Sequence, residues 1–363
     1  MTGALQSIKI SDHSILNFQG KMLAWYDRNR RIIPWRAAKG EIPDPYHVWL
    51  SEIMCQQTTV PAVVPYFLKF IKLWPSVHDL AKADKDDIMR EWAGLGYYAR
   101  ARNLHKCAQV IAFERGGVFP RSKAELLTLP GIGDYTAAAI MAIAFSQPET
   151  VVDGNIERIM ARVYAIQDPL PQSKPRLKSA AATFFTPDLE RPGDFAQSLM
   201  DLGSGVCTPK SPKCMLCPVN EHCEAYALGI AEQLPARSAK PEKPQKFGYV
   251  YWALNEAGEV LCHKRPDSEM LGGMIGLPTS AWIEKTEGAQ PEHIDFIGSD
   301  SLSVSGDLVK HSFTHFDLTL NIVQVNGLTA PAPLDFFWVR RSDINPAHYP
   351  TLFKKVVSLC LKR

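Results

Sequence analysis

The spacing of apolar residues predicts helices through the first part of the chain. From Asp12 to about Leu228, apolar residues recur three and four positions apart, as in AELLTLPGIGDYTAAAIMAIAF, and alternating runs are few. This period places the apolar side chains on one face of a helix. The pattern therefore predicts a mostly α-helical region over residues 1–230.

The pattern changes after a segment that has almost nothing to bury. Residues 231–247 contain QLPARSAKPEKPQ, whose prolines and charges are typical of a linker. Beyond it the sequence carries strand patterns in FGYVYWALN, EVLCHKR, FTHFDLTLNIVQVNG and FFWVRR, and a helical pattern in TLFKKVVSLCLKR. Residues 248–363 are therefore expected to form a smaller α+β domain.

Length and composition are consistent with this division. A chain of 363 residues exceeds one average domain, and 46% hydrophobic residues can build ordinary cores. No stretch approaches the roughly 20 apolar residues that span a membrane, and the first residues do not read as a secretion signal. We therefore expect a cytoplasmic protein. The net charge of +2 does not by itself indicate a nucleic-acid partner.

Four of the eight cysteines lie close together in the sequence. Six residues separate Cys207 from Cys214, two separate Cys214 from Cys217, and five separate Cys217 from Cys223. Four such thiolates can hold a zinc ion or an iron–sulfur cluster, and the spacing alone does not choose between them. The remaining cysteines are expected in the core as small hydrophobic residues: Cys55, Cys107, Cys262 and Cys360.

A glycine turn separates two helical patterns in LPGIGDYTAAAI, residues 129–140. Gly131 and Gly133 allow the backbone to turn tightly and to approach another molecule closely. The amide groups that open the following helix could then bind a phosphate. Plain helical hairpins use the same residues, so the turn alone is weak evidence.

Two carboxylates stand in positions that suit catalysis. Glu52 lies within the otherwise apolar helical segment DPYHVWLSEIMCQQTTV, and burial there would raise its pKa toward that of a general acid. Asp153 precedes a helical run in VVDGNIERIMAR, where an aspartate is most often a helix cap. Its pairing with Glu52 favours a catalytic role as well.

Taken in order, these motifs resemble the MutY-type adenine DNA glycosylases of the helix-hairpin-helix superfamily. The resemblance rests on SEIMCQQT, GLGYYARARNLHK, LPGIGDYTA, VDGNIERIMAR and the cysteine spacing, and it runs from about Met22 to the C-terminus. It implies a helix-hairpin-helix at about 125–145, a [4Fe–4S] cluster loop at 207–223 and a Nudix-like domain at 248–363. It also implies a bacterial, nucleoid-associated monomer.

The reaction implied by the resemblance is base excision from double-stranded DNA. Adenine opposite 8-oxoguanine or guanine would be flipped out and its N-glycosidic bond hydrolysed. Glu52 would protonate adenine N7 and later activate water, and Asp153 would stabilise, or transiently bond to, the sugar, with support from Tyr135 and Asn155. Members that cut the strand have a lysine where this chain has Tyr135, so a monofunctional enzyme is expected.

The resemblance also implies which residues contact cluster and DNA. The cluster ligands would be Cys207, Cys214, Cys217 and Cys223. Gln57 and Tyr97 would fill the gap left by the flipped base, and Arg31, Trp35 and Asp201 would line the adenine pocket, with Asp201 in place of a frequent glutamate. The 8-oxoguanine would be contacted by Thr58, Leu95, Phe313, Thr314 and His315, with Thr314 in place of the usual serine.

Other functions stay open at this point. A thymine or uracil mismatch glycosylase of the same superfamily could share Tyr135 and the cluster but would have no reason to carry residues 248–363. An endonuclease III-like lyase is disfavoured by Tyr135, and a non-catalytic DNA reader would need neither Glu52 nor Asp153. The C-terminal domain lacks the glutamate-rich helix of Nudix hydrolases after MLGGMIGLPTSAW, so it is expected to read bases without catalysis.

Overall fold

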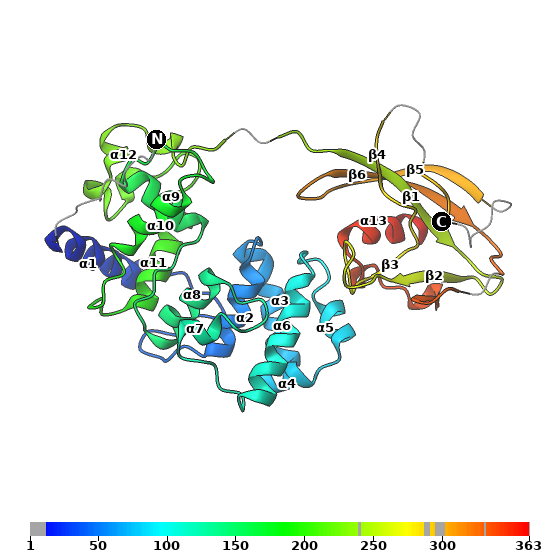
Figure 1. Cartoon of the computed structure of the whole chain (residues 1–363), viewed down its shortest axis with the longest axis horizontal. Coiled ribbons are helices and arrows are strands. Elements are labelled where there is room, and N and C mark those ends of the chain that lie inside the picture. Colours follow the sequence, from blue (N-terminus) through cyan, green and yellow to red (C-terminus); the bar gives the residue numbers. More distant parts are fainter. Residues whose placement is uncertain (1–11, 239–240, 287–290, 295–301, 330–331, 363) are drawn as a thin grey trace. The chain divides into compact units, whose positions relative to one another are not determined.

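The computed structural model describes residues 12–238, 241–286, 291–294, 302–329 and 332–362 (Figure 1). Contacts divide the chain into two compact units. The first comprises Met1–His78 and Cys107–Lys240, and the second comprises Asp79–Lys106 and Pro241–Arg363. Residues 79–106, which the apolar pattern groups with the helical region, thus pack with the C-terminal domain. No described helix is long and apolar enough to cross a membrane.

The first unit is helical, as the apolar spacing predicts. Its helices are α1 (Asp12–Asn29), α2 (Pro45–Cys55), α3 (Val60–Leu73), η1 (Val110–Glu114), α7 (Lys123–Leu126), α8 (Asp134–Phe145), α9 (Gly154–Val163), α10 (Lys174–Ala182), α11 (Pro192–Gly205) and α12 (Glu224–Ala227). Helix α8 is the centre of this unit, because its side chains are buried throughout 136–144 and it packs against α2 and α11.

Helices α7 and α8 form the predicted helix-hairpin-helix. The turn between them places Gly131 at a φ of 78°, in the left-handed region that glycine adopts without strain. Ile132 is buried and anchors the turn from within, while Gly133 caps α8 with extended backbone. The first amides of α8 therefore open beside this turn.

Close packing of α8 against α11 depends on a glycine. A Cβ atom at Gly193 would lie 2.7 Å from the backbone oxygen of Ala142, which is closer than real Cβ atoms come. The two helix backbones therefore approach closely at this point, and α11 is held against the central helix. This contact fixes the position of the residues on α11 that border the pocket described below.

The second unit combines a helical segment with two sheets. The segment holds most of α4 (Val77–Lys82), α5 (Lys85–Glu91) and most of α6 (Ala99–Gln109). The strands are β1 (Gln245–Ala253), β2 (Glu259–Lys264), β3 (Ile275–Gly276), β4 (Ile283–Glu284), β5 (Leu302–Ser312), β6 (Asp317–Val325) and β7 (Phe336–Arg340). Lys85 pairs with Asp267 at 2.7 Å, and Lys264 pairs with Asp86 at 2.5 Å, which joins α5 to the strand region.

The strands form a four-stranded sheet in the order β4-β1-β6-β5 and a three-stranded sheet in the order β3-β2-β7. Strands β1 and β6 run parallel, and the other pairs run antiparallel. Helix α13 (Thr351–Cys360) buries Phe353, Val356 and Val357 in the same apolar cluster as Val250 of β1. This α+β arrangement agrees with the predicted C-terminal domain.

The segment that links the helices to the strands is shorter than the predicted linker, 231–247. A 3₁₀ turn covers Ala231–Gln233 at its start, and β1 begins at Gln245, which pairs with Asp317. Ladder hydrogen bonds to β6 override the weak strand propensity of these polar residues. In the run IEKTEGA, Ile283–Glu284 forms β4, and residues 287–290 lie outside the described residues.

Candidate active site

Helix α2 presents Glu52 to a pocket in the first unit. The helix begins with Pro45 after Asp44, whose side chain accepts a hydrogen bond from the amide of Tyr46. Its buried face packs into the core through Trp49, Leu50, Ile53 and Met54. Glu52 lies off this face and lines the pocket, which has a volume of about 930 Å³ and is thus of a size that binds ligands.

Most of the predicted catalytic and pocket residues line this one pocket. They come from the segment after α1, from α2 and the turn that follows it, from the hairpin, and from the start of α9. These residues are Arg31, Trp35, Glu52, Gln57, Thr58, Gly131, Gly133, Tyr135, Asp153 and Asn155. Residues distant in the sequence are therefore gathered around one cavity.

Tyr135, in the first turn of α8, donates a hydrogen bond from its hydroxyl to Oε2 of Glu52 at 2.7 Å. Burial, together with the nearby Glu52 and Asp153, raises the pKa of the Tyr135 hydroxyl well above its ordinary value. The phenol is therefore a proton-bearing donor at neutral pH. It fixes the orientation of the Glu52 carboxyl group from one side.

The pKa of Glu52 is raised to about 7 as the net result of opposing effects: burial and the nearby Asp153 raise it, whereas the Tyr135 hydrogen bond and Arg36 lower it. A carboxyl group with this pKa is partly protonated at neutral pH. It can therefore give up a proton to a bound base and take one back afterwards.

Asp153 caps α9 and also lines the pocket. As the cap of α9, it accepts hydrogen bonds at Oδ1 from the amides of Asn155 at 2.9 Å and Ile156 at 2.8 Å. Its Oδ2 accepts from Nδ2 of Asn155 at 2.8 Å. These donors hold the carboxylate rigidly at the pocket wall and complement its negative charge.

Asn155 is in turn held by Arg158, which the sequence reading did not single out. A guanidinium nitrogen of Arg158 donates to Oδ1 of Asn155 at 2.8 Å, and its Nε donates to the backbone oxygen of Cys207 at 2.7 Å. Asp153 is thereby linked through Asn155 and Arg158 to the cysteine loop. The sequence could have indicated this contact, because Asn155 and Arg158 are three residues apart and therefore lie on the same face of one helix.

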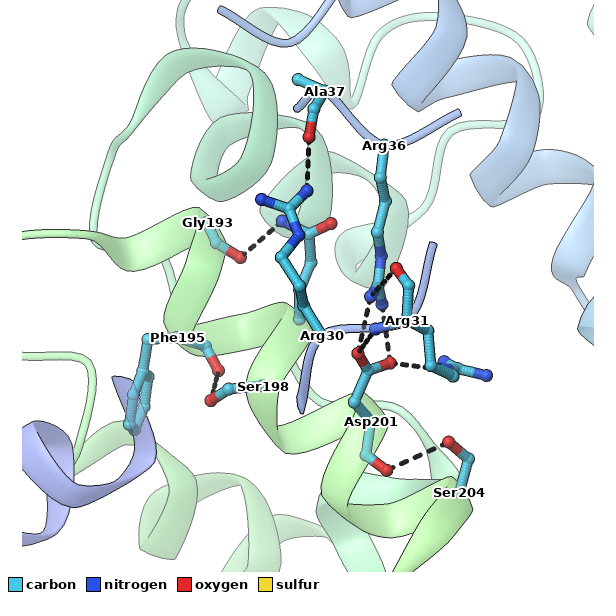
Figure 2. A network of polar contacts seen from close by, with 10 residues as sticks. Arg30, Arg31, Arg36, Ala37, Gly193, Phe195, Ser198, Asp201 and Ser204 are labelled. Atoms are coloured by element: carbon cyan, nitrogen blue, oxygen red, sulfur yellow. Dashed lines mark hydrogen bonds and ion pairs between the residues drawn. The ribbon is translucent and has the colours of Figure 1, made fainter. Parts of the chain in front are cut away.

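The resemblance implied that Asp201 lines the pocket, and the structure places it behind the pocket wall. It does not line the pocket: its carboxylate is buried against Arg31 and Arg36, as Figure 2 shows. One helical turn earlier, the buried Gln197 does line the pocket. Its Nε2 donates to the Gly193 carbonyl at 3.1 Å, so its amide oxygen and its second N–H can still bind a ligand.

The predicted wedge residues share an unusual backbone. Gln57 has a φ of 57° and Tyr97 a φ of 48°, and both side chains are exposed. A left-handed conformation costs free energy in any residue but glycine, so it persists where the surroundings impose it, often at functional positions. Leu95, which was expected to contact 8-oxoguanine, has a buried side chain in the second unit.

The predicted base-reading loop lies between β5 and β6 in the second unit. Phe313 packs on Trp282 and Phe316, while Thr314 and His315 are exposed. The hydroxyl groups of Tyr97 and Thr314 lie 2.8 Å apart and form a hydrogen bond. The structure thus brings two of the predicted DNA-contacting residues together.

The four clustered cysteines are free of disulfides and partly buried in the loop after α11. Arg162 of α9 donates a hydrogen bond to the Cys207 sulfur at 3.1 Å, as suits a thiolate. Burial raises the pKa values of Cys214, Cys217 and Cys223, and the neighbouring cysteines contribute. Their thiols therefore share one site and could hold a metal group that accepts four sulfur ligands.

The other four cysteines lie only partly where the sequence predicts them. Cys107, Cys262 and Cys360 are buried as expected. Cys55 is not, because it is partly exposed and lines the pocket, one turn beyond Glu52 on the same helix face. The spacing of three residues between Glu52 and Cys55 could have indicated this position, because residues three apart share a helix face.

Within the described residues, no three His, Cys, Asp or Glu side chains are grouped tightly enough for a single metal ion.

Comparisons with known proteins identify families for both parts of the chain. Three family models match: HhH-GPD superfamily base excision DNA repair protein over residues 50–181, a NUDIX domain over residues 249–359, and the iron-sulfur binding domain of endonuclease III over residues 207–223. The last begins and ends at a clustered cysteine. The mixed helical and α+β fold expected from the sequence is confirmed.

Two curated relatives are similar over most of their length. The adenine DNA glycosylase of Homo sapiens is 33% identical, with 93% of this chain and 73% of that protein aligned. The adenine DNA glycosylase of Buchnera aphidicola subsp. Acyrthosiphon pisum is 37% identical, with 91% and 93% aligned. A solved thermostable thymine-DNA glycosylase matches with a TM-score of 0.52 and 29% identity, covering 60% of this chain and 98% of that chain.

Proposed function

The chain belongs to the adenine DNA glycosylase family, and on this premise we propose that it removes adenine opposite 8-oxoguanine or guanine without cutting the strand. It is a DNA glycosylase of base excision repair that binds DNA and carries a [4Fe–4S] cluster. The observation that carries the proposal is the pocket shared by Glu52 and Asp153, whose carboxyl groups have different surroundings. We expect the enzyme to act as a monomer.

Glu52 is the proton donor in the proposed reaction. A flipped adenine enters the pocket, and the protonated Glu52 gives its proton to N7 as the N-glycosidic bond breaks. The bonding electrons leave with the base, which departs neutral. The carboxylate of Glu52 then takes a proton from the water that adds to C1′ of the sugar, and so returns to its starting state.

Asp153 stabilises the positive charge that develops on the sugar. Its carboxylate is fixed by the amides of Asn155 and Ile156 and by the Asn155 side chain before substrate arrives. A preorganised charge needs no rearrangement during the reaction and is therefore effective in a closed pocket. Tyr135 keeps the Glu52 carboxyl group in place through its 2.7 Å hydrogen bond.

The absence of strand cleavage follows from the chemistry of the pocket side chains. A lyase needs an amine to form a Schiff base with the sugar. Among the described residues that line the pocket there is no lysine, and Tyr135 opens α8 where a lysine would be required. A phenol cannot form that intermediate, so the abasic site is expected to be released intact.

The residues proposed to hold the cluster are Cys207, Cys214, Cys217 and Cys223. Their free thiols and the Arg162 hydrogen bond to Cys207 fit a group bound by four thiolates. When bound, the cluster cross-links the loop and adds metal-linked folding free energy. Lys210 and Lys213, both exposed in this loop, are then available for contacts with DNA phosphates.

Recognition of the base opposite adenine is assigned to the exposed Thr314 and His315. Thr314 can donate to and accept from the edge of 8-oxoguanine, and His315 can contact that base or a phosphate. Their exposure and the Tyr97 hydrogen bond to Thr314 support a role at the DNA surface. Gln57 is proposed to fill the space that the flipped adenine vacates, and Thr58 to contact the opposite base.

The test is single-turnover cleavage of duplexes that carry adenine opposite 8-oxoguanine, guanine or thymine. We expect excision in the first two, with strand breaks only after alkali. Glu52→Gln and Asp153→Asn should still bind DNA but lose excision, because one removes the acid and the other the negative charge. Glu190→Gln, an exposed carboxylate of the same unit, is the matched control.

Three results would contradict the proposal. Excision of thymine or uracil opposite guanine without excision of adenine would favour the activity named for the solved thymine-DNA glycosylase. Strand cleavage without alkali, with a covalent adduct after borohydride reduction, would show that an amine reaches the sugar. Near-normal rates in the Glu52 or Asp153 variants would refute the assigned roles.

A further inference from the structure

Asp201 is an enclosed charge beside the pocket, with its side chain 1% exposed. Both of its oxygens are occupied: Oδ1 accepts from Nε of Arg31 at 2.5 Å and Nη2 of Arg36 at 2.8 Å. Oδ2 accepts from Nη1 of Arg36 at 2.6 Å and the amide of Arg31 at 3.0 Å. Figure 2 shows this carboxylate between the two arginines. Asp201 therefore has no free oxygen edge for a base.

The two arginines, in contrast, line the pocket together with Glu52. The Arg36 side chain is 6% exposed, so water contributes little to screening its charge. Arg31 is 37% exposed and can be solvated. Arg36 also lies over the ring of Tyr26, with the guanidinium carbon 5.8 Å from the ring centre. The guanidinium of Arg36 is thus fixed between Asp201, an aromatic face and the pocket.

From these contacts we propose that Asp201 is a positioning residue for base excision, which neutralises Arg36 and holds Arg31 at the pocket wall so that neither guanidinium opposes protonation of the base. This inference rests on the proposed function, in which Glu52 is the proton donor. It gives Asp201 an indirect part in catalysis, through Arg36, in place of direct contact with adenine.

The physical argument concerns charge in a poorly hydrated site. Proton transfer from Glu52 places positive charge on the base, and an uncompensated guanidinium nearby disfavours that state. The charged and titratable groups that face Glu52 are Tyr135 from α8, Asp153 ahead of α9, and Arg36 from the segment between α1 and α2. Paired with Asp201, Arg36 acts as part of a dipole, whose field falls off faster than that of a single charge.

The directions of the pKa shifts agree with this arrangement. Burial would raise the pKa of Asp201, but its hydrogen bonds and attraction to Arg36 hold it below the ordinary value, so the carboxylate is ionised. Arg36 already lowers the pKa of Glu52 in the paired state. Removing the negative charge of Asp201 should lower it further, and Glu52 should then lose its proton at a lower pH.

The experiment is the pH dependence of the single-turnover excision rate in Asp201→Asn. The basic limb, where Glu52 deprotonates, is expected to move about one unit to lower pH, with about a fivefold loss of rate near pH 7. Asp194→Asn is the matched control on α11, because Asp194 pairs with Arg191 at 2.6 Å and is partly exposed. It should leave the limb in place.

Breaking a buried ion pair can also unfold a protein, so a second variant is needed. Arg36→Met combined with Asp201→Leu removes both charges and fills similar volume. The basic limb should return to the wild-type position or above it, because the cation that opposes Glu52 is gone. Thermal unfolding of each variant, measured in parallel, separates lost folding from changed chemistry.

Three outcomes overturn the inference. The first is an unchanged basic limb in Asp201→Asn with a rate loss that only follows its lower melting temperature. The second is a shifted limb that the double variant does not restore. The third is near-normal excision in Glu52→Gln, which would remove the proposed acid and this inference together. The first two leave the proposed function intact, since the enzyme would still excise adenine through Glu52.

Discussion

The carboxyl group of Glu52 is expected to make the stability of this protein depend on pH. Its pKa is about 7 in the folded protein and about 4.5 when exposed. The folded value is the higher one, so the carboxyl group stabilises the fold below pH 4.5, and this contribution is lost as pH rises through 7. Glu52→Gln, which keeps the acceptor for Tyr135 but cannot ionise, should therefore be more stable than the wild type at pH 8.

Thermal or urea unfolding at pH 5 and pH 8 measures this effect. The free energy of unfolding of Glu52→Gln should exceed that of the wild type by on the order of 1 to 3 kcal/mol at pH 8, after discounting for pocket water, and by little at pH 5. Glu190→Gln provides the comparison, because that side chain is exposed. Equal differences at both pH values would mean that Glu52 is not desolvated.

Single residues differ in how far the sequence predicts them. The sequence indicated Glu52 because burying a carboxylate in an apolar helix costs free energy unless it is paired or functional. The structure places it at the pocket. Asp201 was assigned by resemblance to the family, which does not determine which side chain of α11 faces the pocket. Gln197 and Asp201 lie on the same helix, and only the packing of α11 decides that Gln197 faces the pocket while Asp201 meets the arginines.

Helix α11 meets the start of α9 at a position that requires glycine. A Cβ atom at Gly203 would lie 2.5 Å from Cβ of Asn155. We expect Gly203→Ala to displace Asn155, weaken its hydrogen bond to Asp153, and lower the excision rate at least tenfold, because the misplacement reaches the reacting groups. Single-turnover kinetics together with thermal unfolding would measure this.

Gly205→Ala is the matched control on the same helix. A Cβ atom there has nothing within 4 Å. Alanine favours a helix over glycine by up to about 1 kcal/mol, so this variant should be as stable as the wild type or slightly more so. It should also cleave at the normal rate. If Gly203→Ala behaves in the same way, the close approach of α11 and α9 does not position Asn155.

At the level of elements, the local sequence pattern predicts individual helices and turns well, but it does not predict which distant segments pack together. The hairpin of α7 and α8 followed from Gly131 and Gly133 between helical periods. The association of residues 79–106 with the C-terminal strands could not be predicted from local pattern. It depends on ion pairs such as Lys85 with Asp267, between residues far apart in sequence. The early start of β1 was also missed, because its first residues are polar and only the pairing with β6 makes them a strand.

At the level of the whole molecule, removal of adenine and reading of its partner base should be separable. Glu52 and Asp153 belong to the first unit, and Thr314 and His315 to the second. Thr314→Ala combined with His315→Ala should lower the preference for 8-oxoguanine over guanine by about tenfold to a hundredfold, since one or two polar contacts are lost. The rate of adenine removal opposite guanine should change far less.

Single-turnover rates on the two duplexes give this preference directly. Thr319→Ala on β6 removes a hydroxyl from the same unit, outside the loop, and should keep the wild-type preference. Replacing Tyr97 by Phe removes its hydroxyl from Thr314 while Thr314 stays, which separates loop positioning from base contact. Full preference in a folded double variant would show that this loop does not read the lesion.

Arg162 contacts both the cysteine loop and the first part of the linker. Besides the Cys207 sulfur, its guanidinium donates to the carbonyl oxygens of Thr208 at 2.8 Å and Leu234 at 3.0 Å. Without the cluster the loop would lose its cross-link, and we expect the hydrogen bond from Arg162 to Leu234 to hold the linker less firmly. An untethered, proline-rich segment is a preferred site of proteolysis. Iron supply should therefore set the half-life of this enzyme in the cell, because molecules that lack the cluster are degraded first.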